Sequence, residues 1–248
     1  MLHALKRSTV GLSAAKHEPV NTEFENLKTN LDNVQKSLST ALSEIDGAQK
    51  AYKKAATDAG KFSTTLFNLY PNDDDTRVLF KTTLDQVVDV VPKDLEEAIE
   101  PTSQVRSLER VVSAYLTEIK SLAEEYPKLD TARRDYAMYQ AKVDKLGKKD
   151  SDSDKQSRNM GKLEDSKAKY NSLLEGTLHR MKKTYEKAAI MFRASYIAYW
   201  IYQNSVHDIL GKHFGPAMSY ARLHADAVLL ESGTASAPPS PTPPSPTE

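Results

Sequence analysis

The feature that most constrains this chain is a run of apolar residues spaced alternately three and four positions apart, from residue 24 to residue 69. Apolar residues that recur about every 3.5 positions form one stripe along a helix, and other helices must cover that stripe in a left-handed bundle or coiled coil. Pro71 and the polar residues after it predict the end of this helix. The seam consists of Phe24, Leu27, Leu31, Val34, Leu38, Ala41, Ile45, Ala48, Tyr52, Ala55, Ala59, Phe62, Leu66 and Leu69.

A second helical region is predicted from near Thr76, and prolines interrupt it. Pro92, Pro101 and Pro127 lack the N–H that an interior helix position needs, so each is expected to bend or break the helix. The apolar seam resumes after Pro101, and Arg133 falls on it, where an internal ion pair is expected. This seam consists of Val105, Leu108, Val112, Tyr115, Ile119, Leu122, Tyr126, Leu129, Tyr136 and Val143.

A third helical region follows a polar segment. Residues 147–157 include no large apolar side chain, which predicts a solvated turn. The helix after it is predicted from about Arg158. Gly215 and Pro216 are expected to stop or bend this helix before a short continuation to about Leu230.

Composition agrees with this pattern, because the chain has only 9 glycines and 27% charged residues beside 39% apolar ones. We therefore predict an all-α fold, in which three long, kinked, antiparallel helices form a coiled-coil bundle over residues 21–231. A leader, residues 1–20, precedes it, and a disordered tail rich in Pro, Ser and Thr, residues 232–248, follows it. The first and third helices reach on the order of 70 to 80 Å, so a second copy of the chain is expected to cover part of so thin a bundle.

The densest aromatic patch lies late in the third helix, where Phe192, Tyr196, Tyr199, Trp200 and Tyr202 fall within 11 residues. One face of a helix cannot hide so many rings inside its own bundle. A thick intramolecular core is one interpretation. The other is a homodimer interface formed by Phe192, Tyr196, Tyr199 and Trp200, since wide apolar faces usually mark association.

Motifs for chemistry are not found in the sequence. The six histidines are not spaced to place two side chains and a carboxylate on one helix face, and they are interpreted as incidental polar or interface residues. No phosphate-binding glycine loop, nucleophile elbow or framed carboxylate pair is present, and the 0 cysteines remove thiolate chemistry. We expect no enzyme, no cofactor and no metal site.

Charge is segregated along the chain although the formal net charge is +0, which gives no indication of a nucleic-acid partner. Residues 133–169 hold eleven basic and seven acidic residues, and residues 180–193 hold five basic and one acidic, whereas residues 71–100 hold nine acidic and three basic. The basic windows fit a surface for anionic lipid headgroups. They equally fit a solvated helix face with i,i+4 ion pairs, such as Asp144 with Lys148.

The leader is a small cationic amphipath if it is helical. Leu2, Leu5, Thr9 and Leu12 would lie along one side with Lys6, Arg7 and Lys16 beside them, which suits the headgroup layer of a membrane. A frayed tail is the alternative, and an organelle transit peptide is a further one. No apolar run approaches the roughly 20 residues that span a bilayer, so a cytoplasmic protein that meets a membrane peripherally is expected.

The tail repeats the PxxP spacing of SH3 ligands at residues 238–241 and 243–246. No Arg or Lys flanks these prolines. A flexible tail is therefore favoured over a docking motif for an SH3 protein, which stays open as a weak possibility.

Taken together, this pattern resembles the BAR domain family, and specifically its amphiphysin-like N-BAR group, over about residues 20 to 230. Three long helices, the prolines of the second, the basic turn before the third and the leader carry the resemblance. The segment LDTARRDY at residues 129–136 is similar to an Asp-x-Ala-Arg stretch of that family, with Asp130, Ala132 and Arg133 in the matching positions. The resemblance implies an antiparallel homodimer shaped as an elongated crescent, with a concave basic face that holds curved anionic membrane.

The expected function is therefore a homodimeric scaffold that binds anionic phospholipid membranes and senses or generates curvature. A coiled-coil scaffold or tether that binds protein partners without lipid is the alternative. The basic turn and its flanks are expected to touch the membrane, or else the helix positions Arg134, Lys182 and Lys183 do so. The full set of expected membrane-binding residues is Lys6, Arg7, Arg134, Lys142, Lys145, Lys148, Lys149, Arg158, Lys162, Lys182 and Lys183.

Overall fold

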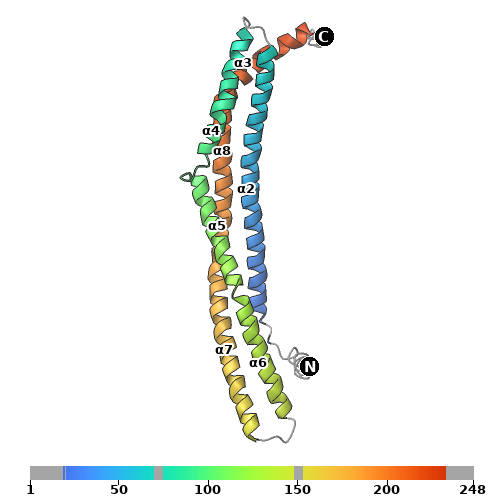
Figure 1. Ribbon diagram of the computed structural model, residues 1–248, viewed down its shortest axis with the longest axis vertical. Coiled ribbons are helices and arrows are strands. Elements are labelled where there is room, and N and C mark those ends of the chain that lie inside the picture. Colours follow the sequence, from blue (N-terminus) through green and yellow to red (C-terminus); the bar gives the residue numbers. More distant parts are fainter. Residues whose placement is uncertain (1–18, 20, 70–74, 148–152, 233–248) are drawn as a thin grey trace, which may run out of the picture. The chain divides into compact units, whose positions relative to one another are not determined.

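Every element of the computed structural model is a helix over the residues that the structure describes, which are 19, 21–69, 75–147 and 153–232. The predicted all-α fold of long, interrupted helices is confirmed (Figure 1). The elements are α2 (Thr22–Leu69), α3 (Asp75–Asp85), the π-helix η2 (Gln86–Val90), α4 (Val91–Glu97), α5 (Gln104–Ala123), α6 (Tyr126–Leu146), α7 (Ser153–Glu186) and α8 (Ala188–Glu231).

These helices divide into two compact units. The first contains the chain up to Ile45 and Arg106–Tyr199, and the second contains Asp46–Val105 and the chain from Trp200 onward. The leader, the residues after Leu69 up to 74, residues 148–152 and most of the tail lie outside the described residues.

Asn21 caps the amino-terminal end of helix α2. The N–H of Phe24 donates a 2.8 Å hydrogen bond to Oδ1 of Asn21, and this side chain satisfies one of the backbone donors that the first turn leaves unpaired. Glu23 and Glu25 lie in the first turn, where their negative charge interacts favourably with the helix dipole.

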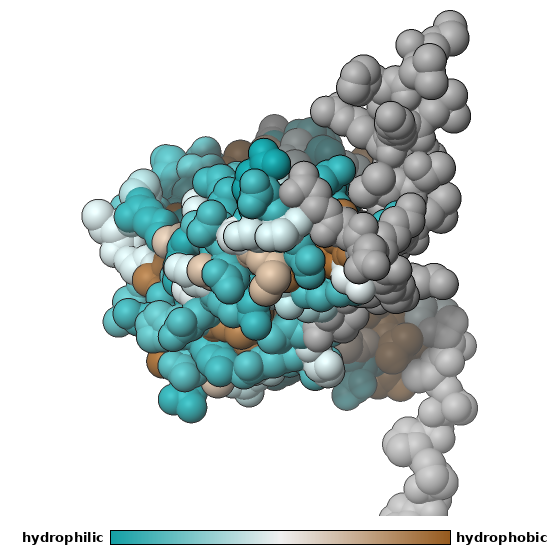
Figure 2. Space-filling model, turned by 90° about the horizontal axis from the view of Figure 1, so that it is seen from below, coloured by the Kyte–Doolittle hydropathy of each residue, from teal (hydrophilic) through white to brown (hydrophobic). Residues whose placement is uncertain are grey.

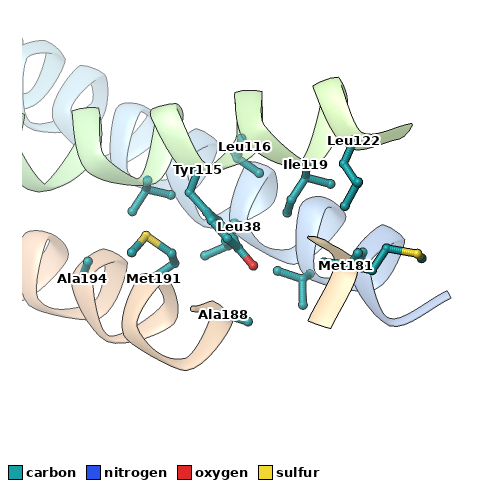
Figure 3. Close-up of a cluster of buried hydrophobic side chains, with 12 residues drawn as sticks. Leu38, Tyr115, Leu116, Ile119, Leu122, Met181, Ala188, Met191 and Ala194 are labelled. Atoms are coloured by element: carbon teal, nitrogen blue, oxygen red, sulfur yellow. The ribbon is translucent and has the colours of Figure 1, made fainter. Parts of the chain in front are cut away.

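The core of the first unit confirms the predicted seams. Leu31, Val34 and Leu38 of α2 are buried together with alternate-turn residues of α5 and with side chains from the α7–α8 region. Figure 3 shows Leu38, Tyr115 and Met191 converging from three helices. The buried members from α5 and beyond are Val112, Tyr115, Leu116, Ile119, Leu122, Met181, Ala188, Met191 and Ala194.

The seam of α2 drifts in the second unit, and the prediction is wrong there. Phe62 is 65% exposed and Leu69 is 73% exposed, whereas Ala56, Gly60 and Ser63 are buried in their place. Each of these buried positions lies one residue beyond the seam position predicted for it, which was Ala55, Ala59 or Phe62. A straight α-helix repeats every 3.6 residues, so a strict heptad rotates away from the core unless the helices supercoil to follow it.

Prolines interrupt the second helical region as predicted, with one addition. Pro101 lies in the turn between α4 and α5, and Pro127 lies at the first turn of α6, directly after the chain breaks from α5. Pro92 lies at the first turn of α4. The π-helix η2 before it was not predicted, and its Val88 and Val87 approach the position where a Cβ on Gly60 would be, at 3.1 and 3.6 Å.

Pro216 neither ends α8 nor separates a short helix, contrary to the prediction, because α8 runs from Ala188 through it to Glu231. Proline removes the hydrogen bond to the carbonyl of residue 212. Lys212 and Pro216 are both exposed, so water is available to that carbonyl.

The third helical region instead breaks at Lys187, between α7 and α8, where the sequence gives no proline or glycine. The carbonyl of Thr184 accepts hydrogen bonds from the Tyr115 hydroxyl at 2.9 Å and from the Lys187 N–H at 3.2 Å. A side chain that inserts in this way diverts the carbonyl from its i+4 partner. Burial raises the pKa of Tyr115 to about 12, so the hydroxyl remains a donor.

Glu118 of α5 also contacts the residues at this break. Its carboxylate accepts hydrogen bonds from Lys187 Nζ at 2.8 and 2.9 Å and from the Thr184 hydroxyl at 3.0 Å. The hydrogen bond from Lys187 is the largest cause that lowers the pKa of Glu118. These contacts hold the ends of α7 and α8 against α5.

Candidate functional site: the charged and apolar faces

The predicted basic turn is only partly described. Lys148 and Lys149, like Lys6 and Arg7 of the leader, lie outside the described residues. On the flank before the turn, Lys145 is exposed, while Lys142 is half-buried with its Nζ 4.7 Å from the centroid of the Tyr139 ring. Figure 2, which looks towards the end where α6 and α7 meet, shows a near face covered mostly by hydrophilic side chains.

Helix α7 begins earlier than predicted, at Ser153 instead of about Arg158. Polar side chains do not prevent a helix, and Asp154 in the first turn interacts favourably with the helix dipole. The predicted turn is therefore helical from residue 153. It is solvated as expected over its described part, since residues 153–155 and 157 are exposed, and Arg158 and Lys162 after it are exposed as well. Arg158 donates from Nε to the carbonyl of Asp154 at 3.2 Å.

Two of the three predicted helix cations are in ion pairs. Arg134 lies 2.7 Å from Asp130, and Lys182 lies 2.6 Å from Glu23. Their side chains still keep 69% and 51% of their surface exposed, so each presents charge to solvent. Lys183 is exposed. Arg133 pairs with Asp130 at 2.6 Å, which confirms the internal ion pair expected on the seam.

The arrangement of the cations along α7 is the feature that sequence reasoning missed. Five exposed cations, here called the α7 basic stripe, fall within about 80° around the helix axis when they are placed at 3.6 residues per turn. The acids Glu164, Glu175 and Glu186 fall on another side, whereas Asp165 lies within the stripe and Asp154 lies about 20° beyond its edge. The signal was available in the sequence, because successive members of the stripe are three, four, seven and fourteen residues apart. The stripe consists of Lys155, Arg158, Lys162, Lys169 and Lys183.

None of the salt bridges between described side chains involves a member of this stripe, whereas the neighbouring Arg180, which falls in the same arc, pairs with Glu125. The buried face of α7 lies beside the stripe and consists of Ser166, Tyr170, Thr177, Met181 and Thr184. The cations are thus held at the edge of a packed helix, and packing inside the chain does not explain their positions.

An apolar face is exposed on α8 in the first unit. Tyr196 is 66% exposed and Ile190 is 60% exposed, and Phe192 and Ile197 are also exposed. The opposite face of the same helix is buried, at Met191, Ala194 and Ala198. Arg193 is the exposed charged residue among these side chains. Contiguous exposed apolar side chains often mark association, so this face is a candidate association surface.

The predicted aromatic patch is therefore divided between two environments. Tyr202 lies in the core of the second unit, T-shaped to Tyr52 with ring centroids 6.2 Å apart. Tyr199 is half-buried, and Trp200, in the second unit, is exposed. The thick intramolecular core is wrong for Phe192, Tyr196 and Trp200, whose rings the chain leaves exposed.

His213 is the histidine that was wrongly interpreted as incidental. It is buried in the second unit, with Nδ1 2.6 Å from Oε1 of Gln86 and Nε2 2.7 Å from Oδ2 of Asp94. It joins α8 to the first residue of η2 and to α4. Spacing along the sequence gave no signal, because the partners are more than a hundred residues away.

Among residues 19–232, with the gaps noted above, no group of three or more His, Asp or Glu side chains is arranged to hold a metal ion. Within the same ranges no helix is both long enough and apolar enough to cross a membrane.

Comparison with known proteins agrees with the fold. The chain superposes on the crystal structure of a BAR protein from Galdieria sulphuraria with a TM-score of 0.70 and 22% sequence identity, over 82% of this chain and 99% of that one. The N-terminal I-BAR domain of D. discoideum IBARa gives a TM-score of 0.42 and 14% identity over 86% and 97% of the two chains, which is too loose to support an argument. No protein-family model and no curated protein matches the sequence. The first superposition shows that the fold is of the BAR type.

Proposed function

We propose that this chain, whose fold is of the BAR type, binds anionic membranes as a homodimer and senses or generates membrane curvature from the cytoplasmic side, without a catalytic role. The observation that carries the proposal is the α7 basic stripe. Its five members are exposed on one edge of α7, and each Lys or Arg near an anionic surface contributes about 1 kcal/mol of binding free energy.

A helix face that is only solvated is expected to show a different arrangement of charges. Cations and acids on such a face usually interleave at i,i+4 spacing, so that each cation has a partner. Helix α2 shows that arrangement in its exposed Lys50–Asp46 and Lys54–Asp58 pairs. On α7, Asp154 and Asp165 lie four residues before Arg158 and Lys169, but the other three acids, Glu164, Glu175 and Glu186, fall on another side of the helix. That majority favours an external anionic partner for the stripe.

The exposed apolar face of α8 supports the homodimer. Ile190, Phe192, Tyr196 and Ile197 expose large apolar side chains on neighbouring turns of one helix, and contiguous apolar surface of this kind often marks an association site. A second copy of the chain is the proposed cover, and the amphiphysin-like N-BAR resemblance of the sequence points the same way.

The experiment is liposome co-sedimentation at low salt with and without anionic lipid. The test variant is Lys162→Glu with Lys169→Glu, and the matched control is Lys36→Glu with Lys120→Glu, two exposed lysines of the same unit. Each pair makes the same change in net charge. The α7 variant is expected to lose more than about tenfold in affinity for anionic liposomes, since two attractive charges in each subunit become repulsive.

Two results would refute the proposal. The first is no lipid-dependent pelleting of the unchanged protein, and the second is an equal loss in the control variant. A further pair, Lys148→Glu with Lys149→Glu, tests whether the turn between α6 and α7 shares in binding. Binding that survives this pair but fails on α7 would assign the contact to the helix edge.

A scaffold or tether for protein partners is the second candidate. The part of α8 after Pro216 favours it, because Met218, Leu223 and Leu230 are exposed there and fall on more than one side of the helix. A dimer that does not pellet with any liposome would support this candidate over the first. The weak SH3 motif of the tail belongs to the same alternative and is tested by a pull-down that depends on residues 238–246.

A further inference from the structure

A cavity of about 400 Å³ lies in the first unit at the start of α2, and neither the α7 basic stripe nor the apolar face of α8 contributes to it. Its apolar lining comes from Phe24 on α2, from Tyr126 and Leu129 on α6, and from Tyr170 and Leu174 on α7. Pockets of this size and composition accommodate an apolar group while a few polar side chains fix its orientation.

Aromatic contacts and a helix break hold the walls of the cavity in place. The rings of Phe24 and Tyr126 meet edge to face with centroids 5.3 Å apart, and Tyr170 stacks on Tyr136 at 6.0 Å. Pro127 lies in the first turn of α6, where its missing N–H is tolerated, directly after the break between α5 and α6. The cavity is therefore a built feature of the junction between α5 and α6.

The charges at the rim select against a strongly anionic ligand. Lys28 and Arg133 are balanced by Glu25 and Asp130, and Arg133 already pairs with Asp130 at 2.6 Å. Lys28 holds its Nζ 5.8 Å from the centroid of the Tyr126 ring. An apolar side chain with polar or cationic neighbours suits this neutral rim better than a phosphate does.

The chain itself supplies such a group next to the cavity. Pro19 is part of the lining, so the segment of residues 1–18, which lies outside the described residues, joins the structure at the mouth of the cavity. Leu12 is the leucine of that segment nearest to Pro19, with Lys16 between them. Seven residues of chain reach up to about 23 Å when extended, far enough to return to the cavity, and so short a tether gives an effective concentration in the millimolar range.

We propose that residues 1–18 dock onto this cavity with Leu12 as the anchor, and that the docked form withholds the segment from the membrane. The docking is inferred from the cavity and from the length of chain between Leu12 and Pro19. Its second half, the competition with membrane, rests on the proposed function.

The test uses the absence of cysteine from the sequence. Ser13→Cys in the segment and Lys28→Cys at the rim are joined by a short bis-maleimide in the full chain without lipid, and the rate of cross-linking is measured. Three further changes are then made in this background: Leu12→Asp removes the anchor, Leu5→Asp is its matched control, and Ala123→Phe fills the cavity. Thermal unfolding checks each protein, and Ala123→Met is a smaller filler if the phenylalanine unfolds it.

Docking predicts that Leu12→Asp and Ala123→Phe each slow cross-linking by about tenfold or more, since both return the tether to random encounters, while Leu5→Asp leaves the rate unchanged. Equal rates in all backgrounds overturn the proposal. A loss with Leu5→Asp and none with Leu12→Asp overturns it as well, because the anchor would be elsewhere.

A lipid arm tests the competition. Ala123→Phe alone, with the segment intact, is expected to increase pelleting with anionic liposomes at limiting lipid. Unchanged pelleting beside lost cross-linking overturns the competition and supports docking as a structural contact only. Failure of the unchanged protein to pellet at all refutes the proposed function and is distinguishable, because cross-linking is measured without lipid.

Discussion

Truncation of Tyr196 to alanine tests the association face of α8 most directly. The side chain is 66% exposed in the single chain. A tyrosine buries about 150 to 250 Å² when it is covered, so about 130 Å² of this ring remains for a partner to cover. At about 25 cal/mol per Å² this surface contributes roughly 3 kcal/mol in each subunit as an upper bound.

A symmetric dimer contains the residue twice, so Tyr196→Ala is expected to remove about 4 to 6 kcal/mol from the free energy of association. At 1.4 kcal/mol for each factor of ten, the dissociation constant rises by about a thousandfold or more. Sedimentation velocity over a dilution series measures this change. Met160→Ala on α7 is the matched control, because Met160 is also an exposed apolar side chain, at 46%.

An unchanged dissociation constant in Tyr196→Ala would refute the assignment of this face to the dimer. Far-UV circular dichroism is measured on the same samples. The variant is expected to stay helical, since the ring is not in the core of its own chain, and a loss of helix would contradict the exposure on which the estimate rests.

Three further predictions concern stability. Gly47→Ala is expected to stabilise the chain by up to about 1 kcal/mol through helix propensity, since its new Cβ would meet nothing within 4 Å. Gly60→Ala is expected to stabilise it by less, since its Cβ would lie 3.1 Å from Val88. Equal increases in the free energy of unfolding, measured by chemical denaturation, would refute the contact with η2. Glu118 has a lowered pKa in the fold, so its contribution is present above its unfolded pKa of about 4.3 and is lost as the pH falls through the lower folded value. The carboxylate is 39% exposed, so the effect is under about 1 kcal/mol, and Glu118→Gln should flatten the acid limb of the stability curve; an identical limb would count against the Lys187 contact. Asp94→Ala leaves a ring nitrogen of buried His213 without its partner and is expected to cost about 1 to 3 kcal/mol, whereas Glu97→Ala, at an exposed neighbouring position, should change little; equal losses would show that the histidine contact is not the cause.

The sequence by itself determined the class of fold, because the signals for it are local. A stripe at 3.5-residue spacing identified Leu31, Val34 and Leu38 as core, and the missing N–H of proline correctly placed the breaks near Pro101 and Pro127. The resemblance to BAR domains rested on the same local features, and the fold is of that type. The basic cations of α7 were also visible, although their shared edge was not read from their spacing.

Tertiary structure decided the features that depend on groups distant in the sequence. Phe62 lies on the predicted seam, yet it is exposed while Gly60 is buried, because the neighbours of α2 determine which side of a drifting stripe is covered. The break at Lys187 requires the hydroxyl of Tyr115, 69 residues away from Thr184, and the burial of His213 requires Gln86 and Asp94. Proline at 216 does not end α8, since that stretch is solvated and water can replace the lost hydrogen bond. Local spacing predicts which apolar residues favour burial. The packing of the helices determines which of them are buried.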